Sequence, residues 1–178
     1  MQEYLEDAQI GGIQYSQSIG RKTEQYCRIG RIEMIIAIAS DHGGFALKEK
    51  IKEFLRTRDD IKIVDLGTTS EESVDYPIYG KACGEAVASG KADRGIVVCG
   101  TGIGISMAAN KVKGVRCGLC TSVEMAELTR RHNNANILAL GGRITDPDLA
   151  IEITKTWLDT EFEGGRHKRR TDMLDDMI

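Results

Sequence analysis

Short apolar runs alternate along most of this chain with longer segments in which the apolar positions recur at helical spacing. Residues 34–40 (MIIAIAS) are almost all apolar, which is typical of a parallel strand that is covered on both faces. In residues 44–58, apolar residues recur at helical spacing, with lysine and glutamate between them. The alternation predicts strands at residues 34–40, 61–66, 95–99, 115–119 and 136–140, and helices at residues 44–58, 76–89, 103–110, 122–131, 146–158 and 166–177.

Strand–helix repeats joined by short links favour a parallel sheet with helices on both faces. We therefore expect an α/β fold: a Rossmann-like three-layer α/β/α sandwich with a five-stranded parallel sheet, in a single domain that ends in a C-terminal helix. The expected strand order is the flavodoxin-like 2-1-3-4-5, which makes the first and third strands neighbours. This domain covers residues 34–178, whereas residues 1–33 are polar, lack a strong period and are expected to form a flexible N-terminal extension.

The composition narrows the class of protein. The chain has 178 residues, which is enough for one domain with a full core. No apolar run reaches the roughly 20 residues that a membrane helix needs, and the net charge of −3 gives no general attraction to nucleic acid. Neither a membrane nor a nucleic acid is therefore expected as a partner. The scattered cysteines are odd in number, 5, and no secretion segment is evident, which predicts reduced thiols and a cytoplasmic location.

A glycine-rich loop carries the strongest candidate chemistry. The third predicted strand ends at Cys99, and the loop that follows consists of Gly100, Thr101, Gly102, Ile103 and Gly104. A strand–loop–helix unit directs backbone N–H groups and a helix N-terminus at one small volume, which suits an anion and favours a thiolate at Cys99. The spacing G-x-G-x-G fits neither the dinucleotide fingerprint nor a Walker loop, so a plain tight turn is the alternative interpretation.

Further polar residues follow the first and fifth predicted strands. Asp41 and His42 come directly after the first strand, and Arg143 follows the fifth. Ligands of open parallel sheets bind beyond the carboxyl ends of the strands, the edge at which all three of these residues are expected. Because the first and third strands are expected to be neighbours, Asp41 and His42 should meet Cys99 there. The pair Cys117 and Cys120 has the spacing of half a metal or redox site, but no second pair accompanies it, and no metal site is predicted.

Two more polar segments lie outside these strand ends. His132 and Asn133 belong to a polar stretch that is expected to be a connection after the fourth helix. The basic tail places Arg166 and Arg170 four residues apart, hence on one face of a helix, where they could clamp one phosphate. The alternatives for this tail are a solvated helix face and a weak nucleic-acid patch.

Several short motifs occur in a fixed order: SDHGG at 40–44, VDYP at 74–77, CGTGIGIS at 99–106, AANK at 108–111, RHN at 131–133 and EGGRH at 163–167. Together they resemble the type B ribose-5-phosphate isomerases, of the family that also holds the galactose-6-phosphate isomerase subunits. The resemblance runs from Met34 to about Ile178, and residues 1–33 have no counterpart in it.

The resemblance implies an enzyme that interconverts ribose 5-phosphate and ribulose 5-phosphate through a cis-enediol, without a metal or a cofactor. Cys99 matches the base that moves a proton between C2 and C1, and His132 matches the residue that opens the furanose ring. The amides of residues 100–104 match the loop that holds the enediolate oxygen, with Thr101 as a further donor. The positions matched to substrate or phosphate binding are Asp41, His42, Tyr76, Gly100, Gly102, Ile103, Gly104, Asn133, Arg143, Arg166 and Arg170.

The residues leave the substrate open, and they suggest that subunits share a site. The alternatives to ribose 5-phosphate are galactose 6-phosphate or allose 6-phosphate, and a phosphosugar-binding module without catalysis. His132 precedes the fifth strand, so it is expected about 15 Å from Cys99, at the opposite edge of the sheet. We therefore expect a homodimer, or a tetramer, in which His132, Arg166 and Arg170 of one subunit complete the Cys99 pocket of its partner.

Overall fold

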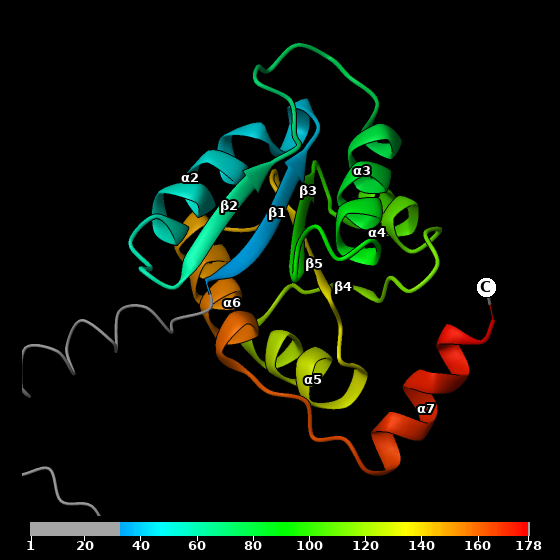
Figure 1. Ribbon diagram of the computed structural model, residues 1–178. Coiled ribbons are helices and arrows are strands. Elements are labelled where there is room, and N and C mark those ends of the chain that lie inside the picture. The colour runs from blue at the N-terminus through cyan, green and yellow to red at the C-terminus, as the bar shows by residue number, and fades with distance from the viewer. Residues whose placement is uncertain (1–32, 178) are drawn as a thin grey trace, which may run out of the picture. The chain divides into compact units, whose positions relative to one another are not determined.

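The structure is a computed structural model and describes residues 33–177 (Figure 1). The extension predicted for residues 1–33 lies outside the described residues, except for Glu33. The strands are β1 Met34–Ser40, β2 Ile61–Asp65, β3 Arg94–Cys99, β4 Cys117–Leu119 and β5 Ile137–Gly141. The helices are η1 His42–Gly44, α2 Phe45–Leu55, α3 Tyr76–Ala88, α4 Ile103–Ala109, α5 Val123–Asn133, α6 Pro147–Asp159 and α7 Arg166–Asp175. None of these helices has the length and apolar character needed to cross a bilayer.

The strands run parallel, in the order β2-β1-β3-β5-β4. The expected neighbours β1 and β3 are confirmed, but the expected order 2-1-3-4-5 is wrong for the last two strands. β5 is buried along its whole length and therefore takes an inner place, while the half-buried β4, which is shorter than predicted, forms the edge. This exchange pairs Gly141 of β5 with Cys99 of β3, so the segment after β5 begins beside the cysteine.

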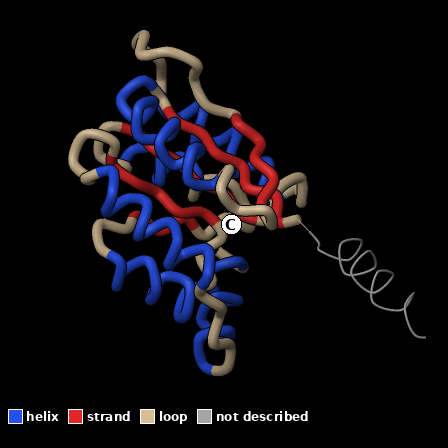
Figure 2. Tube along the Cα trace, turned by 90° about the vertical axis from the view of Figure 1, so that its left-hand side faces the viewer, coloured by secondary structure: helices blue, strands red, loops and turns tan. Residues whose placement is uncertain are grey.

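Helices cover both faces of the sheet, which confirms the three-layer sandwich (Figure 2). Side chains alternate along β1: Ile36 and Ile38 join the core under α2, α5 and α6, whereas Ala37 and Ala39 join the core under α3 and α4. The small side chains on the second face leave room for α3, whose Cys83 sulfur lies 3.7 Å from the Ala37 carbonyl oxygen. α7 follows as a C-terminal helix and packs against α5.

Capping residues set the limits of the helices. Ser122 accepts a hydrogen bond from the first turn of α5, and Asp146 caps α6 with Pro147 in its first position. The predicted end of α5 at residue 131 is wrong, because the helix continues through Asn133. It is terminated by Asn134, which adopts a left-handed φ of 46°.

Candidate active site

Cys99 ends β3 at the carboxyl edge of the sheet, and its side chain is 5% exposed. The backbone N–H of Gly102 donates a hydrogen bond to the Cys99 sulfur at 3.2 Å. Gly102 has a φ of 77°, and an added Cβ would lie 2.8 Å from the carbonyl oxygen of Leu140, so glycine is required at this turn. The predicted glycine loop therefore folds around the cysteine and aims one amide at its sulfur.

The loops after β1, β3 and β5 contact one another through their backbones. The Gly142 N–H donates to the Cys99 carbonyl at 2.7 Å, and the Arg143 N–H donates to the Gly100 carbonyl at 3.0 Å. A Cβ on Gly43 would lie 3.1 Å from the Gly100 nitrogen and 3.4 Å from Arg143 Cζ. The sequence predicts that the ends of β1 and β3 meet, and they do. The end of β5 joins them because β5, contrary to the expected order, pairs with β3.

Asp41 and His42 hold the loop that follows β1. The buried Asp41 carboxylate accepts a hydrogen bond from the Gly44 N–H at 3.0 Å and so caps η1. His42 Nδ1 lies 3.2 Å from the Val74 nitrogen, whose N–H it can accept. This contact ties the long loop between β2 and α3, at the top of Figure 1, to the end of β1. Both residues therefore organise the edge at which Cys99 lies.

Arg143 and Tyr76 flank the glycine loop on two sides. A Cβ on Gly100 would lie 3.4 Å from Arg143 Cδ, so the arginine side chain passes directly over the loop. The Tyr76 ring covers Gly104 in the same way, with Cζ 2.7 Å from such a Cβ. Thr101 is exposed, and its Oγ1 accepts a hydrogen bond at 3.4 Å from an amide at the start of α4. A cavity of about 430 Å³ opens beside Arg143.

The carboxyl edge of the sheet thus collects most of the predicted site residues. They are Asp41, His42, Tyr76, Cys99, Gly100, Thr101, Gly102, Ile103, Gly104 and Arg143.

A second group of predicted residues lies at the amino edge. His132 stands in the last turn of α5 and not in the predicted connection, since the helix runs on through Asn133. Basic residues are favourable in a last helical turn because of the helix dipole. α5 leads into the start of β5, so the end of α5 lies at the edge of the sheet opposite the end of β3 (Figure 1). Arg166 and Arg170 are exposed on α7. Within one chain, the predicted residues are therefore divided between two places.

The His132 ring stacks on the ring of His167, with centroids 4.4 Å apart and planes 6° from parallel. Glu163 lies beside this pair, with its Oε2 facing both rings. Its other carboxylate oxygen, Oε1, accepts a hydrogen bond from Arg131 Nε at 2.7 Å. The hydrogen bond from Arg131 lowers the pKa of Glu163 below its ordinary value. Burial lowers the pKa of His167, and the nearby positive charge of Arg166 adds to the effect. Glu163 is therefore held as a carboxylate and His167 as a neutral ring at neutral pH.

Glu163 and His167 are not among the site residues that the sequence predicts. Both stand in a motif that carries the family resemblance, but their spacing alone does not place them beside His132. One signal was available: His167 and Thr171 are four residues apart and form the buried face of a helix that is otherwise strongly polar.

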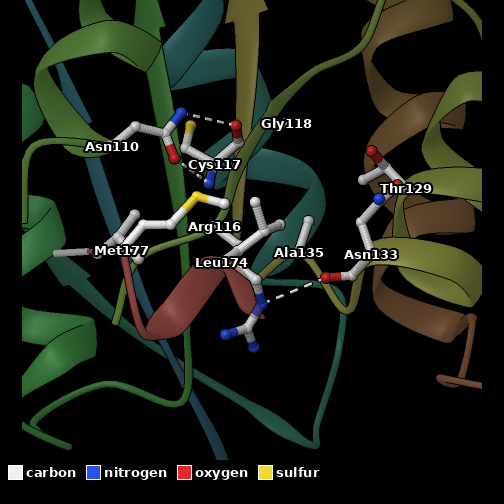
Figure 3. A pocket seen from close by; sticks show the side chains of 10 residues that line it. Asn110, Arg116, Cys117, Gly118, Thr129, Asn133, Ala135, Leu174 and Met177 are labelled. Carbon is white, nitrogen blue, oxygen red and sulfur yellow. Dashed lines mark hydrogen bonds between the residues drawn. The ribbon is translucent and has the colours of Figure 1, made fainter. Parts of the chain in front are cut away.

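A cavity of about 480 Å³ lies between β4, α5 and α7 (Figure 3). Arg116 borders it, donating from Nε to the Asn133 carbonyl at 3.2 Å and pairing through Nη1 with Asp175 at 2.6 Å. Leu174 and Met177 line the same cavity from the C-terminal segment. Arg116 therefore ties the end of α5 to α7 and keeps the second group of residues together.

In open parallel α/β sheets ligands bind beyond the carboxyl ends of the strands, and this is where the buried Cys99 thiol lies under a backbone amide. The fold and this candidate site are those of an α/β protein. The model of the family described as Ribose/Galactose Isomerase matches residues 36–174, and the chain belongs to this family.

Individual relatives agree with the family match. The putative sugar phosphate isomerase YwlF of Bacillus subtilis is 51% identical over 146 residues, which cover 80% of this chain and 96% of the relative. Ribose-5-phosphate isomerase B of Escherichia coli is 45% identical over 139 residues, which cover 78% of this chain and 93% of the relative. The solved structure of Clostridium thermocellum ribose-5-phosphate isomerase B has a TM-score of 0.79 at 53% identity, covering 81% of this chain and 97% of that one.

Proposed function

We propose that this protein is a ribose-5-phosphate isomerase, which interconverts ribose 5-phosphate and ribulose 5-phosphate through a cis-enediol without a metal. The observation that carries the proposal is the contact between the Gly102 N–H and the Cys99 sulfur at 3.2 Å. Isomerisation needs a base next to a carbonyl and donors for the oxygen that becomes negative. The loop after β3 offers a thiol and a row of backbone amides within one turn of chain.

The reaction follows from this arrangement. In the open-chain aldehyde the Cys99 thiolate takes the proton from C2, the C1–C2 double bond forms, and the negative charge moves to O1. Amides of the glycine loop bind this oxygen, and the exposed Thr101 hydroxyl is the side chain assigned to assist them. The O2 proton then passes to O1, the C2–O2 double bond forms, and Cys99 returns its proton to C1.

The remaining residues bind the sugar and prepare it for this step. We assign opening of the furanose ring to His132 and contacts with the sugar to Asp41, His42, Tyr76 and Asn133. Arginine presents a planar fork of donors that matches a phosphate dianion. The arginines assigned to sugar or phosphate are Arg143, Arg166 and Arg170.

We propose further that each active site is built from two subunits. His132, Arg166 and Arg170 lie at the amino edge of the sheet and Cys99 lies at the carboxyl edge, so a single chain does not bring them together. A two-fold axis would place the amino-edge group of each subunit against the carboxyl edge of the other and create two equal sites. A homodimer meets this requirement, and a tetramer would repeat it.

The family description names galactose beside ribose, so a six-carbon phosphosugar is the second substrate to test. Galactose 6-phosphate and allose 6-phosphate would undergo the same chemistry, whereas a phosphosugar-binding module would bind without turnover. Ribose 5-phosphate isomerisation belongs to the non-oxidative branch of the pentose phosphate pathway, in the cytoplasm, and we propose this setting for the protein.

Turnover of ribose 5-phosphate in the presence of EDTA tests the proposal directly. Wild type is compared with Cys99→Ala and with Cys120→Ala, a matched control because Cys120 is a buried thiol that belongs to the other of the two cores. We expect wild type and the control to be active, and Cys99→Ala to lose at least about a thousandfold in kcat. Turnover of a six-carbon substrate alone, binding without turnover, or full activity of Cys99→Ala would each contradict the proposal.

A further inference from the structure

Glu163 is fixed beside His132 by contacts of both its backbone and its side chain. Its N–H donates to the Arg131 carbonyl at 3.1 Å. Its Oε1 accepts from Arg131 Nε at 2.7 Å, and Arg131 is itself held by Glu127 at 2.8 Å. The carboxylate is therefore anchored through one oxygen, and the other oxygen is presented to the two stacked histidines.

That second oxygen, Oε2, lies 3.8 Å from His132 Nε2 and 3.5 Å from His167 Nε2. Arg166 Nε donates to His167 Nε2 at 3.4 Å, so this nitrogen is an acceptor and the neutral ring carries its proton on Nδ1. Oε2 is then available to accept an N–H from His132 Nε2. Catalytic hydrogen bonds are often long in an enzyme without substrate and shorten when substrate binds.

The same three side chains have the composition of a metal site, because their ligand atoms lie within 4.8 Å of one another. The stacking argues against that use. A metal ion lies in the plane of each imidazole that binds it, and two nearly parallel rings 4.4 Å apart do not share such a point. Arg131 and Arg166 add positive charge at the same place. The cluster is better suited to orient a ring than to bind a cation.

We propose that Glu163 is a positioning residue, which holds the His132 ring with its proton on Nε2 and leaves Nδ1 to act on the sugar. His167 supports the plane of the ring by stacking on it. A base that is oriented by a carboxylate on its far nitrogen is a recurrent arrangement in enzymes, since the carboxylate selects the tautomer.

This inference rests on the proposed ring-opening role of His132 and makes that role specific. In ring opening, Nδ1 takes the proton of the O1 hydroxyl. The C1–O1 double bond forms as the C1–O4 bond breaks, and O4 receives a proton from water. A His132 ring with its proton on Nδ1 would present a donor to O1 and could not accept this proton.

The imidazole tautomers provide a test that does not depend on turnover. The full-length chain contains three histidines, so a two-bond ¹H–¹⁵N spectrum resolves each ring. We expect Nε2–H for His132 in wild type and a mixture of tautomers in Glu163→Gln, with His42 unchanged. Asp172→Asn is the matched control, because it neutralises a nearby carboxylate, one on α7 that pairs with Lys168 at 2.8 Å. An Nδ1–H tautomer in wild type, or no change in Glu163→Gln, would overturn the proposal.

Kinetics with an open-chain substrate separates positioning from a merely structural role. The analogue 4-deoxyribose 5-phosphate lacks O4 and cannot close a furanose ring. For ribose 5-phosphate we expect Glu163→Gln to lower kcat/KM about tenfold, and Glu163→Asp to recover part of this loss. For the analogue we expect Glu163→Gln to lower kcat/KM less than about twofold. Equal losses with both substrates would show that Glu163 acts only on the fold.

A double-mutant cycle completes the test. If Glu163 acts through His132, then Glu163→Gln has no further effect on ribose 5-phosphate turnover once His132 is alanine. Additive losses would contradict the proposal. If wild type turns over neither substrate, the proposed isomerase function fails, and the tautomer spectrum still decides whether Glu163 orients His132.

Discussion

The N–H of Gly102 points at the sulfur of Cys99 from 3.2 Å, across a loop that reverses direction within three residues. The reversal depends on the left-handed conformation of Gly102, with a φ of 77°. The thiol and the amides beside it are therefore parts of one rigid turn. A change in the turn moves the thiol and these amides together.

Gly102→Ala should damage activity and stability together. The new methyl would lie 2.6 Å from Leu119 Cδ1 and 2.8 Å from the Leu140 carbonyl oxygen, in a strained backbone conformation. We expect a loss of about 3 kcal/mol in the free energy of unfolding and at least about tenfold in kcat. Gly114→Ala is the control: its φ is 82°, and an added Cβ meets no atom of the described chain within 4 Å. It should lose about 1 kcal/mol with kcat unchanged. Equal effects of the two variants in urea unfolding and turnover would contradict the argument.

Iodoacetamide should inactivate the protein through Cys99. Burial raises the pKa of Cys83 to about 12 and that of Cys120 to about 11. At pH 8 about one in a thousand Cys120 thiols is ionised, and fewer at Cys83, so neither competes as a nucleophile. We expect peptide mapping to show that the loss of turnover follows the labelling of Cys99, and that substrate slows both. Inactivation with Cys99 unlabelled would refute this.

Mixing two inactive variants tests whether subunits share sites. In a heterodimer of Cys99→Ala with His132→Ala, one site lacks both residues and the other is intact. After unfolding and refolding as an equal mixture, we expect about one quarter of wild-type turnover, because half of the dimers are mixed and each has one working site. Each variant refolded alone is the control. Mixed dimers that are demonstrated by mass but show no activity would rule out the shared site.

Asp65 should make stability depend on pH. Burial raises the pKa of Asp65, but hydrogen bonds from Lys48 and Lys52 outweigh burial and hold the pKa below its ordinary value. The carboxylate therefore stabilises the fold above the unfolded-state pKa, and this contribution is lost as pH falls through the lower folded-state pKa.

Asp65→Asn should lose about 2 kcal/mol at pH 7, because the fully buried Lys48 then lacks its main partner. The difference from wild type should shrink as pH falls from 5 to 3, measured by urea unfolding. Glu53→Gln, which removes the exposed pair with Lys50, should have no measurable effect. A constant difference across this pH range would contradict the assignment.

The hydrophobic pattern of the sequence was sufficient to predict the elements and the layers, because period and burial are local properties of each segment. The order of the last two strands was not predictable in that way, since alternation does not say which strand lies inside. In the structure, Ile137–Gly141 is buried along its whole length and lies inside the sheet, whereas the short Cys117–Leu119 is half-buried and forms the edge.

The candidate site was predictable where strand ends define it and less so elsewhere. Asp41, Cys99 and Arg143 lie at or just after the carboxyl ends of β1, β3 and β5, and parallel strands have these ends at one edge of the sheet. The cluster of His132 with Glu163 depends instead on how the segment before α7 packs against α5. Sequence spacing contains no information about such a tertiary contact.

The strands whose ends form the candidate site, β1, β3 and β5, are consecutive in the sheet, and β2 and β4 flank them. Amides of β3 are therefore bonded between two strands that each pair with a further strand, and releasing them separates both hydrophobic cores. Fluctuations that free an edge strand leave this centre in place. Solvent exchange of the β3 amides should thus require global unfolding of the domain.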